Sequence, residues 1–295
     1  MSDPETMLLR LLRCELTAVN QQFSHILSLR AGGDTETAAR IAEIDDVDFP
    51  NAMRIADYLI REGIPVRLGG DRYMPGCARQ AVLLAEQDME RRMAEALDNV
   101  VPADAMQERL VATARAPRTA YGVWLADELE KNAESGPAVE RPVPEIDELV
   151  AHLLASLELS MIHALMHRQA GDNDAADGSW ATSGAAMMHM THLVRFFARE
   201  DVTPAPGRYP PIRIAETSDA APDFEQALAD QCATAALKAE AAVESPQLAT
   251  LCDGIAYSCE ELTEWRPGRP HPALQTNPPA FMSFERTYNT YVSSG

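Results

Sequence analysis

The sequence has few cysteines, and their spacing matches neither of the patterns that crosslink a fold. The five cysteines are odd in number and include no Cys-x-x-Cys pair. This argues against a disulfide framework and against a structural zinc site. The N-terminus has no basic segment followed by a long apolar run, so no signal peptide is expected. We therefore expect a reduced, cytoplasmic protein.

Basic residues are also scarce. The chain has 25 Lys and Arg against 45 Asp and Glu, which gives a formal net charge of −20. Repulsion between like charges argues against nucleic acids and anionic membrane surfaces as partners. No run of eighteen apolar residues is present, so insertion into a membrane is not expected. A protein partner or self-association is the interaction that the sequence allows.

Common catalytic signatures are missing as well. The sequence has no Gly-x-Gly-x-x-Gly after a strand, no Walker loop and no Gly-x-Ser-x-Gly. Dinucleotide-binding enzymes, P-loop enzymes and α/β-hydrolases are therefore not indicated. Aromatic residues make up only 6% of the chain, whereas hydrophobic residues make up 46%. The prevalence of Ala, Leu, Met, Glu and Arg favours helices.

Apolar residues recur at helical spacing in two halves of the chain. The pattern predicts helices at about 5–31, 50–62, 76–99, 104–133, 146–169, 182–200, 220–243 and 246–264. A stretch rich in Pro, Gly and charge separates the halves, and the last thirty residues hold five prolines between 267 and 279. We expect domains at 1–133 and 146–265, a linker at 134–145 and an extended tail at 266–295.

The two halves resemble each other. The sequences EGIP (62–65) and EDVTP (200–204) each end a second helix, and GVWLADEL (122–129) parallels ELTEW (261–265) near the end of a fourth. Equivalent positions lie about 140 residues apart, which is too long for a solenoid repeat. The spacing fits a duplicated four-helix bundle.

One carboxylate stands inside an apolar stripe. Leu8, Leu12, Val19 and Ile26 recur at helical spacing, and Glu15 lies among them. Burying an ionised carboxylate costs several kcal/mol unless it is paired or binds a metal. Either a positive group lies opposite Glu15, or this helix is less buried than its pattern suggests.

The segment that begins with Glu15, ELTAVNQQFSHIL, resembles the first helix of bacterioferritin and other ferritin-like proteins. NAMRIADYLIREGIP resembles their second helix, LLAEQDMERRMAEAL the third and YGVWLADEL the fourth, and the resemblance returns more faintly over 150–265. It implies an all-α fold of two tandem ferritin-like four-helix bundles, followed by the C-terminal extended tail.

The family holds two irons with one Glu from each of helices one and three and a Glu-x-x-His motif from each of helices two and four. In the first half, the resemblance places Arg118 where the motif of helix four begins, and a guanidinium cannot bind a cation. We expect no metal there, but ion pairs from Arg118 to Glu15 and Glu86. The alternative is that Arg118 reaches solvent beside Pro117. The degenerate positions form an expected vestigial-site cluster: Glu15, Asp48, Asn51, Glu86, Arg118 and Tyr121.

In the second half the same resemblance aligns Glu158 with the carboxylate of helix one, His189 with the histidine of helix two and Asp230 with the carboxylate of helix three. Three ligands can hold one metal, either iron or manganese, but scarcely two. Cys259 stands in the fourth helix as a further candidate. His25 is interpreted as a packed or hydrogen-bonded residue rather than a ligand.

Two functions follow as hypotheses. The first is a ferritin-like protein with decayed di-iron sites that serves as a non-catalytic scaffold or partner subunit. The second is a divergent metal-dependent oxidase or oxygenase that works from the second bundle, with Tyr121 or Cys259 as a redox partner. Iron storage is disfavoured, because storage needs a hollow shell of many subunits.

Overall fold

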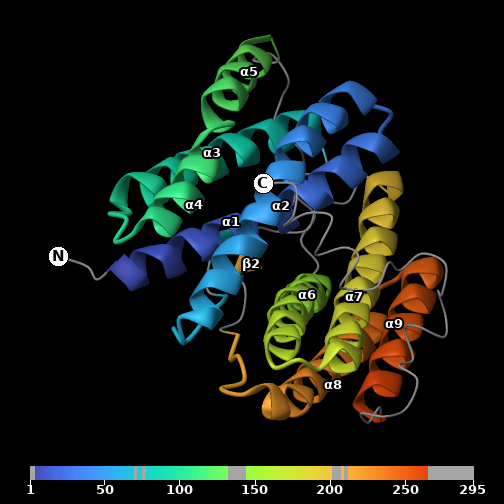
Figure 1. The fold of residues 1–295 in the computed structure, drawn as a ribbon. Helices are drawn as coiled ribbons and strands as arrows, with labels where there is room; N and C mark the ends of the chain where they lie inside the picture. Colours follow the sequence, from blue (N-terminus) through green and yellow to red (C-terminus); the bar gives the residue numbers. More distant parts are fainter. Residues whose placement is uncertain are drawn as a thin grey trace. The chain divides into compact units, whose positions relative to one another are not determined.

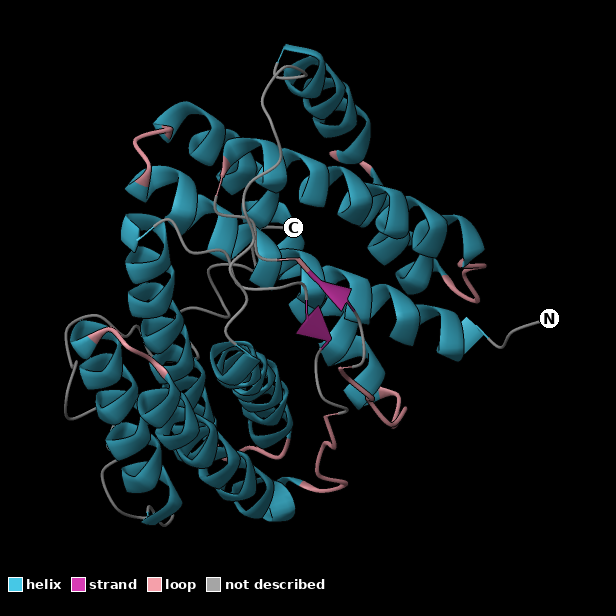
Figure 2. Ribbon diagram, turned by 180° about the vertical axis from the view of Figure 1, so that it is seen from behind, coloured by secondary structure: helices cyan, strands magenta, loops and turns pink. Residues whose placement is uncertain are grey.

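The computed structural model describes residues 4–69, 72–74, 78–131, 144–200, 207–208 and 212–264. Nearly all of these residues are helical, as Figures 1 and 2 show, which confirms the predicted all-α class. The predicted tail at 266–295 lies outside the described residues, as does the predicted linker apart from its last two residues. The helices are α1 (Pro4–Ala31), α2 (Thr35–Arg61), α3 (Arg79–Asn99), α4 (Ala105–Arg115), α5 (Arg118–Lys131), α6 (Pro144–Gln169), α7 (Asn173–Glu200), α8 (Ala221–Ala242) and α9 (Pro246–Glu264), with the two-residue strands β1 (Arg72–Tyr73) and β2 (Gly207–Arg208) and the 3₁₀ turn η1 (Ser218–Ala220).

The chain divides into two compact units. Unit 1 comprises residues 1–64, 71–142 and 194–206, and unit 2 comprises residues 65–70, 143–193 and 207–295. The division departs from the two contiguous domains that the sequence predicts, because a short segment from each half of the chain belongs to the other unit.

Several helix boundaries differ from the predicted ones. The second helix was expected from residue 50, but α2 begins at Thr35, after Asp34 caps its N-terminus by accepting a hydrogen bond from the Thr37 amide. Pro50 therefore lies inside α2 rather than in its first turn. The single helix expected over 104–133 is interrupted between Arg115 and Arg118, where Pro117 has no backbone N–H to donate in a hydrogen bond.

In unit 1, α1 is the central helix. It packs against α2 and α3, while α3 packs against α5 and α2 against α4. Its apolar residues Leu8, Leu11, Leu12 and Leu16 are at most 1% exposed. Several polar residues of α1 are also at most 2% exposed: Glu15, Thr17, Asn20, Gln21, Gln22, Ser24, His25 and Ser28. A central helix with this many buried polar groups requires partners for them from the surrounding helices.

In unit 2, α8 packs against both α6 and α9. By length and composition α6 is the one helix of the described residues that could cross a membrane, with a mean hydropathy of 1.6 over its most apolar window. In this fold 83% of that window is buried inside the protein. The hydropathy of α6 is thus accounted for by its place in the core of unit 2.

Candidate functional site

Glu15 is completely buried, and a cation does lie opposite it. Its side chain is 0% exposed, and its Oε2 atom lies 3.5 Å from Nη2 of Arg118. This is an ion pair without a hydrogen bond, since neither carboxylate oxygen of Glu15 has a hydrogen-bond partner. The apolar stripe on α1 is therefore a core face, and the alternative that this helix is less buried than its pattern suggests is wrong.

Arg118 lies at the centre of a buried charge cluster, in which its guanidinium contacts Glu15, Asp48 and Glu90. It is the first residue of α5, and its side chain is only 9% exposed. Nη1 donates to Glu90 on α3 and Nη2 donates to Asp48 on α2. Nε donates to the carbonyl oxygen of Ala114, at 3.2 Å. The guanidinium thus points inward and links α5 to α2 and α3, so the alternative that Arg118 reaches solvent beside Pro117 is wrong.

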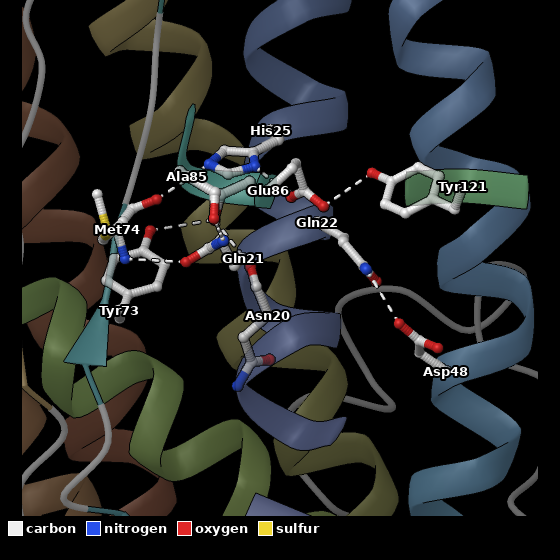
Figure 3. Close-up of polar contacts among 11 residues, drawn as sticks. Asn20, Gln21, Gln22, His25, Asp48, Tyr73, Met74, Ala85, Glu86 and Tyr121 are labelled. Atoms are coloured by element: carbon white, nitrogen blue, oxygen red, sulfur yellow. Dashed lines mark hydrogen bonds and ion pairs between the residues drawn. The ribbon is translucent and has the colours of Figure 1, made fainter. Parts of the chain in front are cut away.

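Glu86 has partners other than the predicted one. Its Oε1 atom lies 2.6 Å from Nδ1 of His25, and its Oε2 atom accepts a hydrogen bond of 2.8 Å from the hydroxyl of Tyr121 (Figure 3). The expected ion pair between Glu86 and Arg118 is therefore wrong. Both oxygens of Glu86 are already engaged, and Glu90, one helical turn further along α3, takes its place beside the guanidinium.

His25 links this carboxylate to the backbone beyond β1. Its Nε2 atom lies 2.9 Å from the carbonyl oxygen of Met74, so Nε2 carries a hydrogen that it donates (Figure 3). Gln21 holds the same segment, because its amide donates to the Ala85 carbonyl and accepts from the Met74 amide. The interpretation of His25 as a hydrogen-bonded residue rather than a ligand agrees with these contacts.

The cluster has more hydrogen-bond acceptors than donors. Beside Glu15, the atoms without a partner include Oε1 of Gln22, Oδ1 of Asp45, and both the oxygen and the nitrogen of the Asn51 amide. The Gln22 nitrogen is engaged, since it donates to Asp48 at 3.0 Å (Figure 3). Leaving buried polar atoms unpaired costs about 1–3 kcal/mol each.

Burial alters the acidity of these carboxyl groups. Desolvation is the largest cause in every case, and neighbouring carboxylates add to it. Together they raise the pKa of Asp45 to about 8 and that of Glu90 to about 7. The pKa of Glu15 is raised well above its ordinary value by burial and by the charge of Asp48, against the opposing effect of Arg118. The site therefore favours protons on its carboxyl groups.

Unit 2 repeats part of this arrangement. Nδ1 of His163 on α6 lies 3.0 Å from Oε1 of Glu225 on α8. His163 follows His25 by 138 positions, and Glu225 follows Glu86 by 139. The pair is protonated differently, because Nε2 of His163 accepts a hydrogen bond from the Ala215 amide, so the imidazole is neutral with its hydrogen on Nδ1.

The turn after the first helix of each unit has the same spacing. Gly33 and Gly171 have φ values of 85° and 82°, a conformation that favours glycine. Asp34 and Asp172 follow them, and each accepts a hydrogen bond from the backbone amide three residues later. The two units thus correspond at a spacing of 138 to 139 residues.

This spacing corrects the sequence alignment of the two halves. Glu158 lies 143 residues after Glu15 and Asp230 lies 144 after Glu86, so neither is the structural equivalent that the sequence suggests. At a spacing of 138 to 139, the three carboxylates around the buried guanidinium are replaced together by apolar residues. Glu15, Asp48 and Glu90 correspond to Leu153, Ala186 and Ala229, which are all at most 4% exposed.

The predicted metal ligands of unit 2 do not converge. Asp230 is exposed on α8, whereas Glu158 and His189 are buried. Nε2 of His189 lies 3.1 Å from the hydroxyl of Ser258. The described part of the chain contains no group of three or more His, Cys, Asp or Glu residues placed to hold a metal ion. Glu158, His189 and Asp230 therefore do not form such a group in the described structure.

Unit 1 does not fit a pair of irons either. A guanidinium occupies the space between Glu15, Asp48 and Glu90, where metal ions would need the same carboxylate oxygens.

Sequence reasoning missed Glu90, Asp45 and Glu225. The first two lie one turn from Glu86 and Asp48 on the same helix faces, which is a signal that the sequence does contain.

Comparisons with models of known protein families, with curated proteins and with solved structures find no match to this chain.

Proposed function

We propose that this chain is a tandem ferritin-like protein with decayed di-iron sites, which acts as a non-catalytic scaffold or partner subunit. Each half of the chain supplies helices in the same order, with a His–Glu pair joining its first and third helices. The matching glycine turns and the common spacing of 138 to 139 residues support a duplication of one four-helix bundle. The family is proposed from the resemblance of the α1 sequence to the first helix of ferritin-like proteins.

The observation that carries this proposal is the buried guanidinium. Arg118 contacts Glu15, Asp48 and Glu90, which come from three helices, and its side chain is 9% exposed. Burial alone would lower the pKa of Arg118, but these carboxylates outweigh it and raise the pKa, so the positive charge is permanent. Because a second cation at this place would be repelled strongly in a low-dielectric interior, the side chain substitutes for the metals of the family.

The test is the metal content of the purified protein. We expect no stoichiometric iron or manganese in protein from cells grown with both metals in excess. Arg118→Ala removes the fixed charge and is expected to give partial metal uptake, which would be the reversal of the decay. Arg115→Ala is the matched control, since Arg115 pairs with Asp98 at the surface. Stoichiometric iron or manganese in the wild-type protein would contradict the proposal.

The same measurement distinguishes the proposed scaffold from the metal-dependent oxidase, which is the alternative function. That function needs a metal in unit 2, where Glu158 and His189 are the buried candidates. A bound metal that is lost in His189→Ala but kept in Arg118→Ala would favour the oxidase. Metal that is lost in neither variant would place the site elsewhere in the chain and would contradict both.

As a scaffold the chain acts through its surface. We propose a protein partner with a basic face or a second copy of the chain, in the reducing cytoplasm, because the net charge is −20 and Cys14, Cys232, Cys252 and Cys259 are free. Light scattering after size-exclusion chromatography distinguishes self-association from a monomer. For a basic partner, affinity is expected to fall as ionic strength rises.

A further inference from the structure

We infer that the buried charge cluster of unit 1 is a proton-binding site, in which Glu15 is held as a neutral carboxylic acid near neutral pH and the cluster exchanges protons with solvent. The inference goes beyond the loss of metal chemistry, because it gives unit 1 a response to pH near neutrality that comes from buried carboxyl groups. It rests on the proposed function in one respect, namely that no metal neutralises these carboxylates.

The first argument is the balance of charge among groups that face the cluster. The acidic groups come from three helices and outnumber the basic ones, which are the guanidinium of Arg118 and the imidazole of His25. The titratable groups are Glu15 and His25 on α1, Asp45 and Asp48 on α2, Glu86 and Glu90 on α3, and Arg118 and Tyr121 on α5. Buried anions in such excess require either protons or other cations.

The second argument is the shortage of hydrogen-bond donors. Both oxygens of Glu15 are unpartnered, although the side chain is 0% exposed. The acceptor atom of Gln22 is also unpartnered, and Gln22 lies two turns after Glu15 on the same face of α1. The amide of Asn51, one turn after Asp48 on α2, adds one unpartnered oxygen and one unpartnered nitrogen, so the unpartnered acceptors still outnumber the donors. A proton on Glu15 turns one unpaired acceptor into a donor, which is the kind of group that the cluster lacks.

The chemistry is a simple dissociation. The carboxylic acid of Glu15 loses a proton to a water molecule or buffer base, and the carboxylate then depends on Arg118 alone, at 3.5 Å. Burial and the adjacent carboxylate of Asp48 raise the pKa of Glu15, which agrees with the acid form near neutrality. The same causes raise the pKa of Glu90 to about 7, so this residue exchanges its proton in the same range.

Unit 2 provides the internal comparison. Leu153, Ala186 and Ala229 stand at the positions of Glu15, Asp48 and Glu90. The three acids are present as a set in one unit and absent as a set from the other. Such joint replacement is expected if the charges work together and not as separate surface pairs.

Infrared difference spectroscopy of the full chain in heavy water, after dialysis against a chelator, tests the inference. At pH 7 we expect a carbonyl-stretch band of un-ionised carboxylic acid, which disappears as the pH is raised. Glu15→Gln should remove the intensity of one carboxyl group, and Glu90→Gln should reduce the band and shift its midpoint. Asp230→Asn is the control and should leave the band unchanged, because Asp230 is exposed.

A band absent at pH 7, or one that Glu15→Gln leaves intact, would overturn the inference. If Glu15→Gln does not fold, selective ¹³C labelling of glutamate side chains in the wild-type protein gives the same answer from the pH dependence of their carboxyl resonances. Metal analysis of the same preparations before dialysis keeps the two proposals separate. Metal without the band contradicts both, whereas neither metal nor band contradicts the proton site alone.

Discussion

The Nδ1 atom of His25 lies 2.6 Å from Oε1 of Glu86, and this contact joins the first and third helices of unit 1. Each of the two side chains has a further partner, since Nε2 of His25 donates to the Met74 carbonyl and Oε2 of Glu86 accepts from the Tyr121 hydroxyl. A chain of hydrogen bonds therefore runs from α5 through α3 and α1 to the segment beyond β1. Both oxygens of Glu86 are thus engaged without Arg118, whose guanidinium contacts Glu15, Asp48 and Glu90 instead.

Removing the guanidinium is expected to destabilise unit 1 severely. Arg118→Ala leaves Glu15, Asp48 and Glu90 buried without a cation, and breaking one partner of a buried ion pair costs about 3–5 kcal/mol. Hydrogen exchange of the amides in α1 and α3 measures the loss. Arg115→Ala should change exchange little, because its pair with Asp98 is exposed.

Removing the whole set is expected to cost less than removing the arginine alone. A variant with Glu15→Leu, Asp48→Ala and Glu90→Ala carries the residues found at the equivalent positions of unit 2, and a fourth substitution, Arg118→Ala, removes the cation that these acids face. Apolar replacement of a buried charge network is often neutral or stabilising by about 1–4 kcal/mol. Comparing the quadruple variant with the single ones gives the coupling energy, and strict additivity would show that the charges act independently.

The stability of unit 1 is expected to fall as the pH rises from about 4 to 8. Burial raises the pKa of Glu90 to about 7 and that of Asp45 to about 8, so the folded state binds protons that the unfolded chain has already released. The stabilisation is complete below about pH 4 and is lost as the pH passes the folded values. Hydrogen exchange corrected for intrinsic rates tests this, and Glu90→Gln should flatten the dependence.

Unit 2 is expected to respond in the opposite direction. Burial, with a smaller effect from His192, lowers the pKa of His189 to about 4. The neutral imidazole stabilises unit 2 fully above about pH 6.5, and this stability is lost as the pH falls toward 4. His189→Gln should reduce the acid sensitivity of amides in α7 and α9. Unchanged sensitivity would mean that other groups set the acid limit of unit 2.

The Tyr121 hydroxyl is expected to stabilise unit 1 through Glu86. Tyr121→Phe removes the donor at 2.8 Å and leaves a buried carboxylate oxygen unpaired, at a cost of about 1–3 kcal/mol. Its ring should remain stacked on Trp124, where the centroids are 5.3 Å apart. Tyr257→Phe is the matched control, because Tyr257 is 63% exposed and bonds Glu261 at the surface. Equal effects of the two substitutions would contradict a special role for the buried hydroxyl.

The sequence predicts the helical class and the burial of Glu15 from the spacing of apolar residues along one helix, and the ferritin-like resemblance adds the ion pair with Arg118 of another helix. It does not predict which carboxylate the arginine contacts. Glu86 and Glu90 lie on the same face of α3, and only the position of His25 on another helix decides between them. The equivalence of Glu225 with Glu86 was missed for a similar reason, since it depends on contacts 62 residues apart.

The two short segments that each belong to the other unit determine whether the chain can be divided into separate fragments. Residues 65–70 count toward unit 2 although they precede it, and residues 194–206 count toward unit 1 although they follow it. A cut in the stretch between α5 and α6 therefore yields two fragments that each lack part of their own fold. Recombinant halves should need each other to regain native spectra, so complementation of separately produced fragments is the natural way to study them.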